Sequence, residues 1–243
     1  NAGGLLSRLT LKGPPTEPVA AVVKPCELRA LIELAKLNQC SLENVLLISS
    51  TCSGVYPLGA GVDGVLDKKL PSYWEAVARG ELDDDVRPTC RACKSFIPEN
   101  ADVTIALLGQ AGLDTQCTLY VNTNKGAALV EGLTGEAWLG DEETDSIRRS
   151  RSQREIFRED LFAGVEVGLE GLIHTFGRCI GCHACKTVCP ICYCRLCYFD
   201  SQDCERSPEF YAGELERKGG LRLPPNTVFF QLGRMAHMSL SCI

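Results

Sequence analysis

The most unusual stretch of the chain is CIGCHACKTVCPICYCRLC (179–197), which places seven cysteines within nineteen residues. Fifteen cysteines occur among the 243 residues of the chain. Cysteines form disulfides, bind zinc or bind iron–sulfur clusters. A disulfide scaffold suits a short secreted chain, whereas this chain is long, has an odd cysteine count and has 45% hydrophobic residues. The choice is therefore between zinc and iron–sulfur clusters.

The spacing of the first four cysteines favours a cluster. These are Cys179, Cys182, Cys185 and Cys189. With the proline that follows they spell C-x2-C-x2-C-x3-C-P, the pattern with which bacterial ferredoxins bind [4Fe-4S] clusters. Zinc sites rarely use three cysteines at that interval. His183 lies between two of these ligands, where we expect a solvent-facing spacer rather than a further ligand.

The cysteines that follow allow a second cluster. They are Cys192, Cys194, Cys197 and Cys204. In two-cluster ferredoxins the cysteine before the proline ligates the other cluster. By this rule Cys189 joins a second cluster with ligands from positions 192, 194 and 197, and the first cluster takes Cys204 or another remaining cysteine. The spacing C-x2-C-x-C-x2-C is not the usual repeat, so one cluster with additional buried thiols is the alternative.

The elements around the distant cysteines form a βαβ pattern. PVAAVVKP (18–25) is a short β-branched apolar run that predicts a buried strand. CELRALIELAKLN (26–38) has apolar residues at helical spacing, and NVLLISS (44–50) predicts a second buried strand. A strand, helix and strand over about thirty residues make a βαβ unit with parallel strands.

This unit brings two cysteines to one edge of a sheet. Cys26 follows the first strand and Cys52 follows the second, and the carboxyl ends of parallel strands lie on the edge where such sheets bind ligands. Cys26 also begins its helix, where the dipole favours a thiolate. The C-x2-C pair Cys90 and Cys93 would complete four ligands. Taken separately, the pair could be half of a zinc site and Cys26 a buried core thiol.

Four segments, in this order, resemble the beta subunits of coenzyme F420-reducing hydrogenases and F420-dependent formate dehydrogenases. The segments are VVKPCELRALIEL, ISSTCSG, CRACKSFIPENADVTIALLG and TLYVNTNKGAALVEG. The resemblance covers about residues 1–135, and it implies FAD and a [4Fe-4S] cluster. It gives the cluster ligands as Cys26, Cys52, Cys90 and Cys93. It also places Thr123, Asn124, Lys125 and Gly126 near the flavin, although a hairpin turn is the alternative for these four residues.

The expected fold class is α/β, with a βαβ-containing flavin and iron–sulfur domain followed by a small ferredoxin-like [4Fe-4S] module. We expect the first domain over residues 1–140, a charged linker and helix over 141–178, and the module over 179–243. The arginines near position 150 predict a solvated face, with docking of an acidic partner as the alternative. They are Arg148, Arg149, Arg151 and Arg154.

The two ends of the chain suggest a piece of a longer protein, because the family usually has more sequence before the first cysteine motif. The chain begins at Asn1 and ends in GRMAHMSLSCI. Cys242 in that last stretch is either the first cysteine of a further C-x2-C motif or a lone thiol. Residues 223–235 are too mixed in residue type for us to assign a helix or a strand to them.

Charge, hydropathy and the absence of certain motifs exclude several functional classes of protein. The net charge of −6 provides no basic field for nucleic acid, and no apolar run reaches the roughly 18 residues of a membrane span. No Ser-His-Asp set, P-loop or G-x-G-x-x-G motif is present, so hydrolase and ordinary nicotinamide-dehydrogenase functions have no support. Because oxygen attacks exposed iron–sulfur clusters, we expect the protein to work in the cytoplasm of an anaerobic cell.

Two functions remain. The first is an oxidoreductase subunit with a flavin and two or three [4Fe-4S] clusters, which exchanges hydride with coenzyme F420 or NAD(P)H. It would pass electrons to partner subunits such as those of formate dehydrogenase, hydrogenase or heterodisulfide reductase. The second is an electron-transfer and docking subunit with clusters only. We expect either one to work inside a multi-subunit redox complex.

Overall fold

The structure is a computed structural model that describes residues 2–61, 65–136, 144–194, 197, 199, 207–219 and 228–240. The chain divides into two compact units, one of residues 2–164 and one that begins at Val165. The charged segment after residue 144, expected to be a linker or an exposed helix, forms the helix α6 (Asp145–Ala163) of the first unit.

The first unit is built on one four-stranded sheet in the order β1-β2-β3-β4. Its strands are β1 (Val19–Val22), β2 (Val45–Ser50), β3 (Val103–Ala106) and β4 (Thr118–Val121). The first three strands are parallel, and β4 runs antiparallel to β3. The α/β class that the sequence predicts is confirmed by this mixed sheet.

The predicted βαβ unit is also confirmed. Strand β1 pairs with β2 in parallel register, with Val22 opposite Ile48, and the helix α2 (Pro25–Lys36) connects the two strands. Pro25 fits the first turn of α2, where a missing backbone N–H costs nothing. Leu28, Leu31 and Leu34 are fully buried. Burying each of these side chains stabilises the fold by roughly 1.5–3 kcal/mol.

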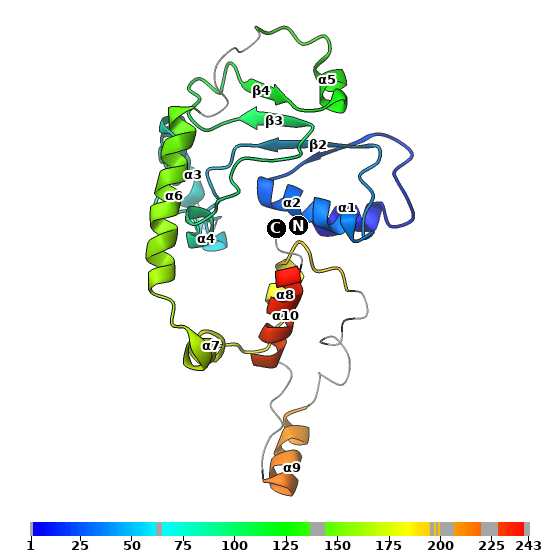
Figure 1. Cartoon of the computed structure of the whole chain (residues 1–243), viewed down its shortest axis with the longest axis vertical. Coiled ribbons are helices and arrows are strands. Elements are labelled where there is room, and N and C mark those ends of the chain that lie inside the picture. The colour runs from blue at the N-terminus through cyan, green and yellow to red at the C-terminus, as the bar shows by residue number, and fades with distance from the viewer. Residues whose placement is uncertain are drawn as a thin grey trace. The chain divides into compact units, whose positions relative to one another are not determined.

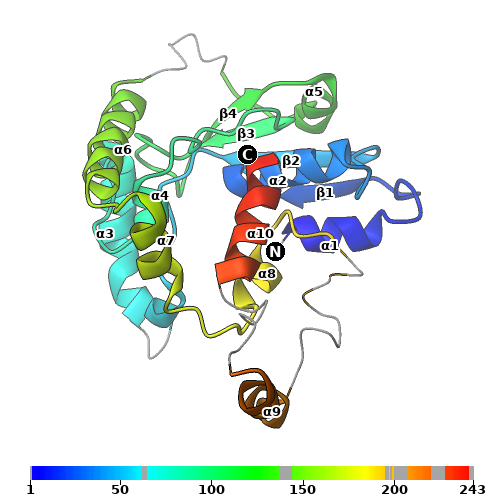
Figure 2. The ribbon, with the colours of Figure 1, turned by 60° about the horizontal axis from the view of Figure 1, so that its bottom comes forward.

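The remaining helices of the first unit lie around the sheet (Figures 1 and 2). They are α1 (Ala2–Leu9), the short 3₁₀ helix η1 (Leu58–Gly61), α3 (Val65–Arg79), α4 (Pro88–Arg91) and α5 (Asn124–Val130). Helix α1 packs on α2, and α4 packs on α6. Both views show α3, α4 and α6 together at one end of the sheet. At that end Phe96, Leu108 and Ile147 form a buried apolar cluster, against which Cys52 packs.

The second unit is helical wherever the structure describes regular elements in it. Its helices are α7 (Gly168–Phe176), α8 (Ala184–Val188), α9 (Pro208–Lys218) and α10 (Val228–Leu240). Helix α10 contacts α7. The sequence did not identify α10, whose first part falls within the stretch left unassigned. Among the described helices of the whole chain, none combines the length and apolar character required to cross a bilayer.

Candidate metal centres

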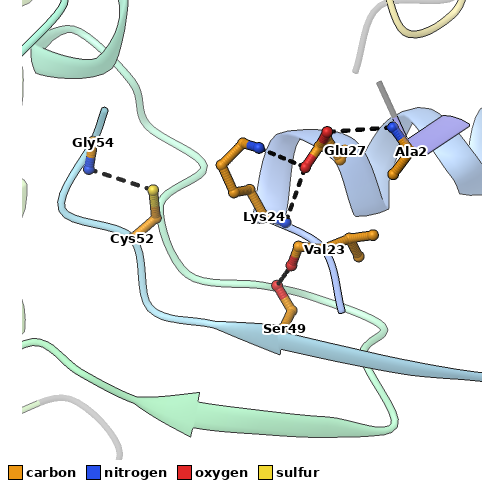
Figure 3. Close-up of polar contacts among 7 residues, drawn as sticks. All are labelled: Ala2, Val23, Lys24, Glu27, Ser49, Cys52 and Gly54. Carbon is orange, nitrogen blue, oxygen red and sulfur yellow. Dashed lines mark hydrogen bonds and ion pairs between the residues drawn. The ribbon is translucent and has the colours of Figure 1, made fainter. Parts of the chain in front are cut away.

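The parallel pairing places Cys26 and Cys52 at one edge of the sheet. Cys26 is the second residue of α2, the helix that begins shortly after β1, and Cys52 comes two residues after β2. The Ser49 hydroxyl at the end of β2 donates to the Val23 carbonyl at 2.7 Å, which ties the two strand ends together (Figure 3). The backbone thus supports the shared location that the βαβ argument predicts.

Cys90 and Cys93 reach the same edge through α4. The Cys90 and Cys93 thiols both raise the pKa of the Cys26 thiol, and the Cys90 thiol raises that of Cys52, so these thiols lie within electrostatic reach of one another. Gly54 allows this approach, because it has φ of +90° and a Cβ there would lie 3.0 Å from the Cys90 Cβ. The Gly54 N–H donates to the Cys52 sulfur at 3.4 Å (Figure 3). We call these four cysteines the sheet-edge group.

Opposing effects act on the pKa of the Cys26 thiol at the start of α2. Burial against the surrounding protein raises the pKa of the Cys26 thiol, and the nearby Lys24 ammonium only partly opposes this. Lys24 is itself held by Glu27, whose carboxylate accepts from its Nζ at 2.6 Å and from its backbone N–H at 3.3 Å (Figure 3). The expected preference of the helix start for a thiolate therefore competes with desolvation at Cys26, and it stays a prediction.

A buried arginine joins the loops of the sheet-edge group. Arg154 of α6 is only 2% exposed. Its Nη2 donates to the Cys52 carbonyl at 2.7 Å, and its Nη1 donates to the carbonyls of Cys90 at 2.6 Å and Cys93 at 3.4 Å. The guanidinium also stacks on the Phe96 ring, with 4.4 Å to the centroid. The sequence-based interpretation of Arg154 as part of a solvated face was wrong.

This arginine provides a test of whether a cluster suits the site. Burial lowers the pKa of Arg154, and the thiols of Cys93, Cys52 and Cys90 oppose that effect. Its hydrogen bonds reach carbonyls and the Ser150 hydroxyl, and no ion pair joins it to a carboxylate in the described part of the chain. A buried cation is costly unless an anion compensates it. Four thiolates around an iron–sulfur cluster would supply that anion, so the residues fit the group.

In the second unit, the first three ferredoxin-type cysteines line one cavity of about 340 Å³. We call it the first cavity. It is lined by Cys179, Cys182, Cys185, His183, Phe230 and Gln231, among other residues. The Gln231 Nε2 lies 3.5 Å from the Cys179 sulfur, within reach of an N–H to sulfur hydrogen bond.

The next four cysteines line a separate cavity of about 240 Å³, the second cavity. They are Cys189, Cys192, Cys194 and Cys197. Burial raises the pKa of the Cys192 thiol, and the neighbouring thiols of Cys189 and Cys194 raise it further. Phe230 of α10 lines both cavities, so the two cavities are adjacent. Cys189 thus lies with the later cysteines rather than with the three that precede it.

His183 is not the solvent-facing spacer that we expected. Its ring packs on Phe230 with centroids 4.5 Å apart and meets Phe199 at 6.4 Å. It adopts φ of +54°, and its Nε2 is buried without a hydrogen-bond partner in the described structure. The prediction failed because Phe230, which covers the ring, lies far away in the sequence.

Among the described residues, no three Cys, His, Asp or Glu side chains converge closely enough to hold a single metal ion. In a cubane each of four irons takes one cysteine, so its ligands surround a volume instead of converging on one ion. Cys204, expected as a further ligand, and Cys242 both lie outside the described residues.

Three of the four residues expected near a flavin make structural contacts, namely Thr123, Lys125 and Gly126. Thr123 caps α5, since its hydroxyl accepts from the Gly126 N–H at 3.2 Å and donates to Asp102 at 2.5 Å. The Lys125 ammonium donates to the carbonyls of Leu42 and Val45. Thr123 and Asn124 thus lie where β4 passes into a helix, so the alternative of a hairpin turn was wrong.

Gly126 gives a test of this structural role. A Cβ at Gly126 would lie 2.2 Å from the Asp102 carbonyl oxygen, which is backbone and cannot move aside cheaply. Gly126→Ala should therefore destabilise the first unit by about 1–3 kcal/mol, measured by urea unfolding followed by circular dichroism. The control is Gly135→Ala, where a Cβ meets nothing within 4 Å. Equal stability of the two variants would contradict the packing role.

The chain matches the model of one family and is similar to curated proteins, among them two formate dehydrogenase subunits. Residues 62–146 match the model of a family described as the C terminus of the coenzyme F420 hydrogenase/dehydrogenase beta subunit. The F420-dependent formate dehydrogenase 1 subunit beta of Methanococcus maripaludis is 25% identical over 263 residues, which cover 92% of this chain and 63% of the relative. The F420-dependent formate dehydrogenase subunit beta of Methanocaldococcus jannaschii is 27% identical over 261 residues, 93% of this chain and 64% of the relative. The chain thus spans less than two thirds of the length of both relatives.

Proposed function

Since the chain belongs to the coenzyme F420 hydrogenase/dehydrogenase beta subunit family, we propose that it is an iron–sulfur electron-transfer subunit of an anaerobic redox complex. It passes electrons between a two-electron carrier, coenzyme F420 or NAD(P)H, and partner subunits such as those of a formate dehydrogenase. The observation that carries this proposal is the pair of adjacent cavities in the second unit, lined by three and by four cysteines.

We assign each cysteine group to one [4Fe-4S] cluster. The sheet-edge group is Cys26, Cys52, Cys90 and Cys93. The first cavity supplies Cys179, Cys182 and Cys185, with Cys204 as the fourth ligand on the ground of sequence spacing. The second cavity supplies Cys189, Cys192, Cys194 and Cys197. A bound cluster moves one electron at a time, and these residues would hold it.

A flavin would accept one hydride, which carries two electrons, and would pass these electrons one at a time to the clusters. The family resemblance suggests FAD near Thr123, Asn124, Lys125 and Gly126. The contacts of these residues give no support to that location of the flavin, and the alternative is a subunit with clusters only. Thr123 and Lys125 already use their polar groups within the protein, and Gly126 is packed against backbone.

One experiment separates these two forms and tests the proposal as a whole. Anaerobically purified protein is titrated with reduced coenzyme F420, with NADPH and with dithionite while cluster absorbance is followed. The flavin-bearing form predicts bleaching by one of the two carriers and release of yellow cofactor on denaturation. The cluster-only form predicts bleaching by dithionite alone and no yellow cofactor. Protein that contains stoichiometric zinc, or that dithionite does not bleach, would refute both.

A further inference from the structure

Arg154 does more at the sheet edge than ordinary packing requires. It extends from α6 to two segments that the chain reaches in separate passes, one after β2 and one formed by α4 and the residues that follow it. Its guanidinium donates to one carbonyl after β2 and to two in the Cys90–Cys93 segment, at 2.6–3.4 Å. The planar fork of arginine suits such simultaneous contacts, whereas the single ammonium of lysine cannot reproduce them.

The charge of Arg154 is as unusual as its contacts. The side chain is 2% exposed, and the groups that act on its pKa most strongly include three thiols but no carboxylate from the described residues. Ser150 and Phe96 complete its surroundings with a neutral hydroxyl and a ring face. Neutral partners satisfy the guanidinium N–H groups without neutralising the cation. Charge balance at this edge thus requires an anion.

We propose that Arg154 is the counter-cation of the cluster at the sheet edge, and that it both positions the ligand-bearing loops and favours the reduced state of the cluster. Reduction by one external electron adds one negative charge to an already anionic centre. A fixed cation nearby stabilises that added charge, and more strongly in a buried site than in water. Net charge and hydrogen bonding are known determinants of cluster potentials. This inference rests on the proposed function, because it needs a cluster at that edge.

The test compares three variants of the anaerobically purified protein. Arg154→Gln removes the charge, Arg154→Lys keeps the charge without the fork, and Arg158→Gln removes a charge one turn further along α6. The Arg158 guanidinium stacks on the Phe162 ring, 5.2 Å from its centroid, and not on the cysteine loops, which makes it a matched control. The cluster is recognised as the paramagnetic signal that disappears in Cys26→Ala, and its midpoint potential is measured by redox titration.

We expect Arg154→Gln to shift the equilibrium toward the oxidised cluster about tenfold, which is about 59 mV for one electron. In Arg154→Lys, the equilibrium between oxidised and reduced cluster should stay within about threefold of that in the wild type. This variant should lose iron to a chelator faster than the wild type, because its ligand loops are held less firmly. Arg158→Gln should change neither quantity. A wild-type potential in a fully loaded Arg154→Gln variant would overturn the proposal.

If the Arg154→Gln variant does not retain the cluster, its potential cannot be measured, and the Arg154→Lys variant tests the counter-cation proposal instead. A loaded Arg154→Lys variant with a nearly wild-type potential supports the counter-cation, and a lysine variant that also fails to load overturns it. Failure of the proposed function itself looks different, because wild-type protein would then have no signal that Cys26→Ala removes.

Discussion

Replacing Cys182 by alanine should abolish one iron–sulfur signal of the protein, and replacing Cys192 should abolish a different one. The reason is the division of the cysteine-rich stretch between two cavities, the first lined by Cys182 and the second by Cys192. If both cavities hold clusters, the intact protein should contain at least about eight iron ions and about eight sulfide ions, since each [4Fe-4S] cluster contains four of each. The measurements are iron and acid-labile sulfide analysis and electron paramagnetic resonance of the reduced protein.

A matched control is Cys117→Ala. Cys117 is an exposed cysteine of the first unit, outside all three proposed groups, so its loss should leave iron content and every signal unchanged. Loss of the same signal in Cys182→Ala and Cys192→Ala would show that one cluster spans both groups. Wild-type protein with four irons or fewer would support the alternative of a single cluster with additional thiols.

The sequence predicts the shared sheet edge of Cys26 and Cys52 because the information is local. Short apolar runs and a helical spacing of apolar residues identify two strands and the helix between them, and the βαβ connection makes those strands parallel. The structure has that register, with Val22 opposite Ile48. Cys26 and Cys52 then share an edge by geometry alone.

Arg154 shows what local patterns miss. It lies in a segment with many charges, which predicts a solvated surface, yet its carbonyl partners are 102 residues away at Cys52 and 64 residues away at Cys90. Nothing in the spacing of α6 indicates such partners. The buried positions of α6 are Ile147, Ser150 and Arg154. They are three and four residues apart, so they lie on one face of the helix. This spacing is the one sequence signal that could have indicated burial of Arg154.

Helix α10 was missed for a related reason. Its sequence mixes apolar, amide and basic residues, because its side chains line cysteine cavities rather than an apolar core. Phe230 lines both cavities, Gln231 reaches the Cys179 sulfur, and Arg234 donates to the Cys185 carbonyl at 3.3 Å. A helix whose composition is this mixed is hard to identify from its apolar residues alone.

Arg154 and Arg234 also suggest a common design of the two units. Each arginine comes from a helix that follows the ligand loops in sequence and donates to the carbonyl of a proposed ligand residue. A guanidinium held in this way keeps a positive charge beside the backbone of the ligands, where it can offset the negative charge of a cluster. Arg154 differs in being almost fully buried, so its effect should be the less screened of the two.

Cys26→Ala and Cys52→Ala should each remove the same cluster signal, although a whole helix separates the two residues in sequence. The parallel pairing of β1 and β2 puts both at one sheet edge, and a [4Fe-4S] cluster needs all four of its cysteines. The double variant should therefore lose no more iron than either single variant. Cys40→Ala is the control within the same βαβ unit, since Cys40 is buried and its thiol faces the Leu31 carbonyl at 3.5 Å. It should keep every signal. If Cys26→Ala and Cys52→Ala abolished different signals, the two cysteines would belong to separate centres and the sheet-edge group would not exist.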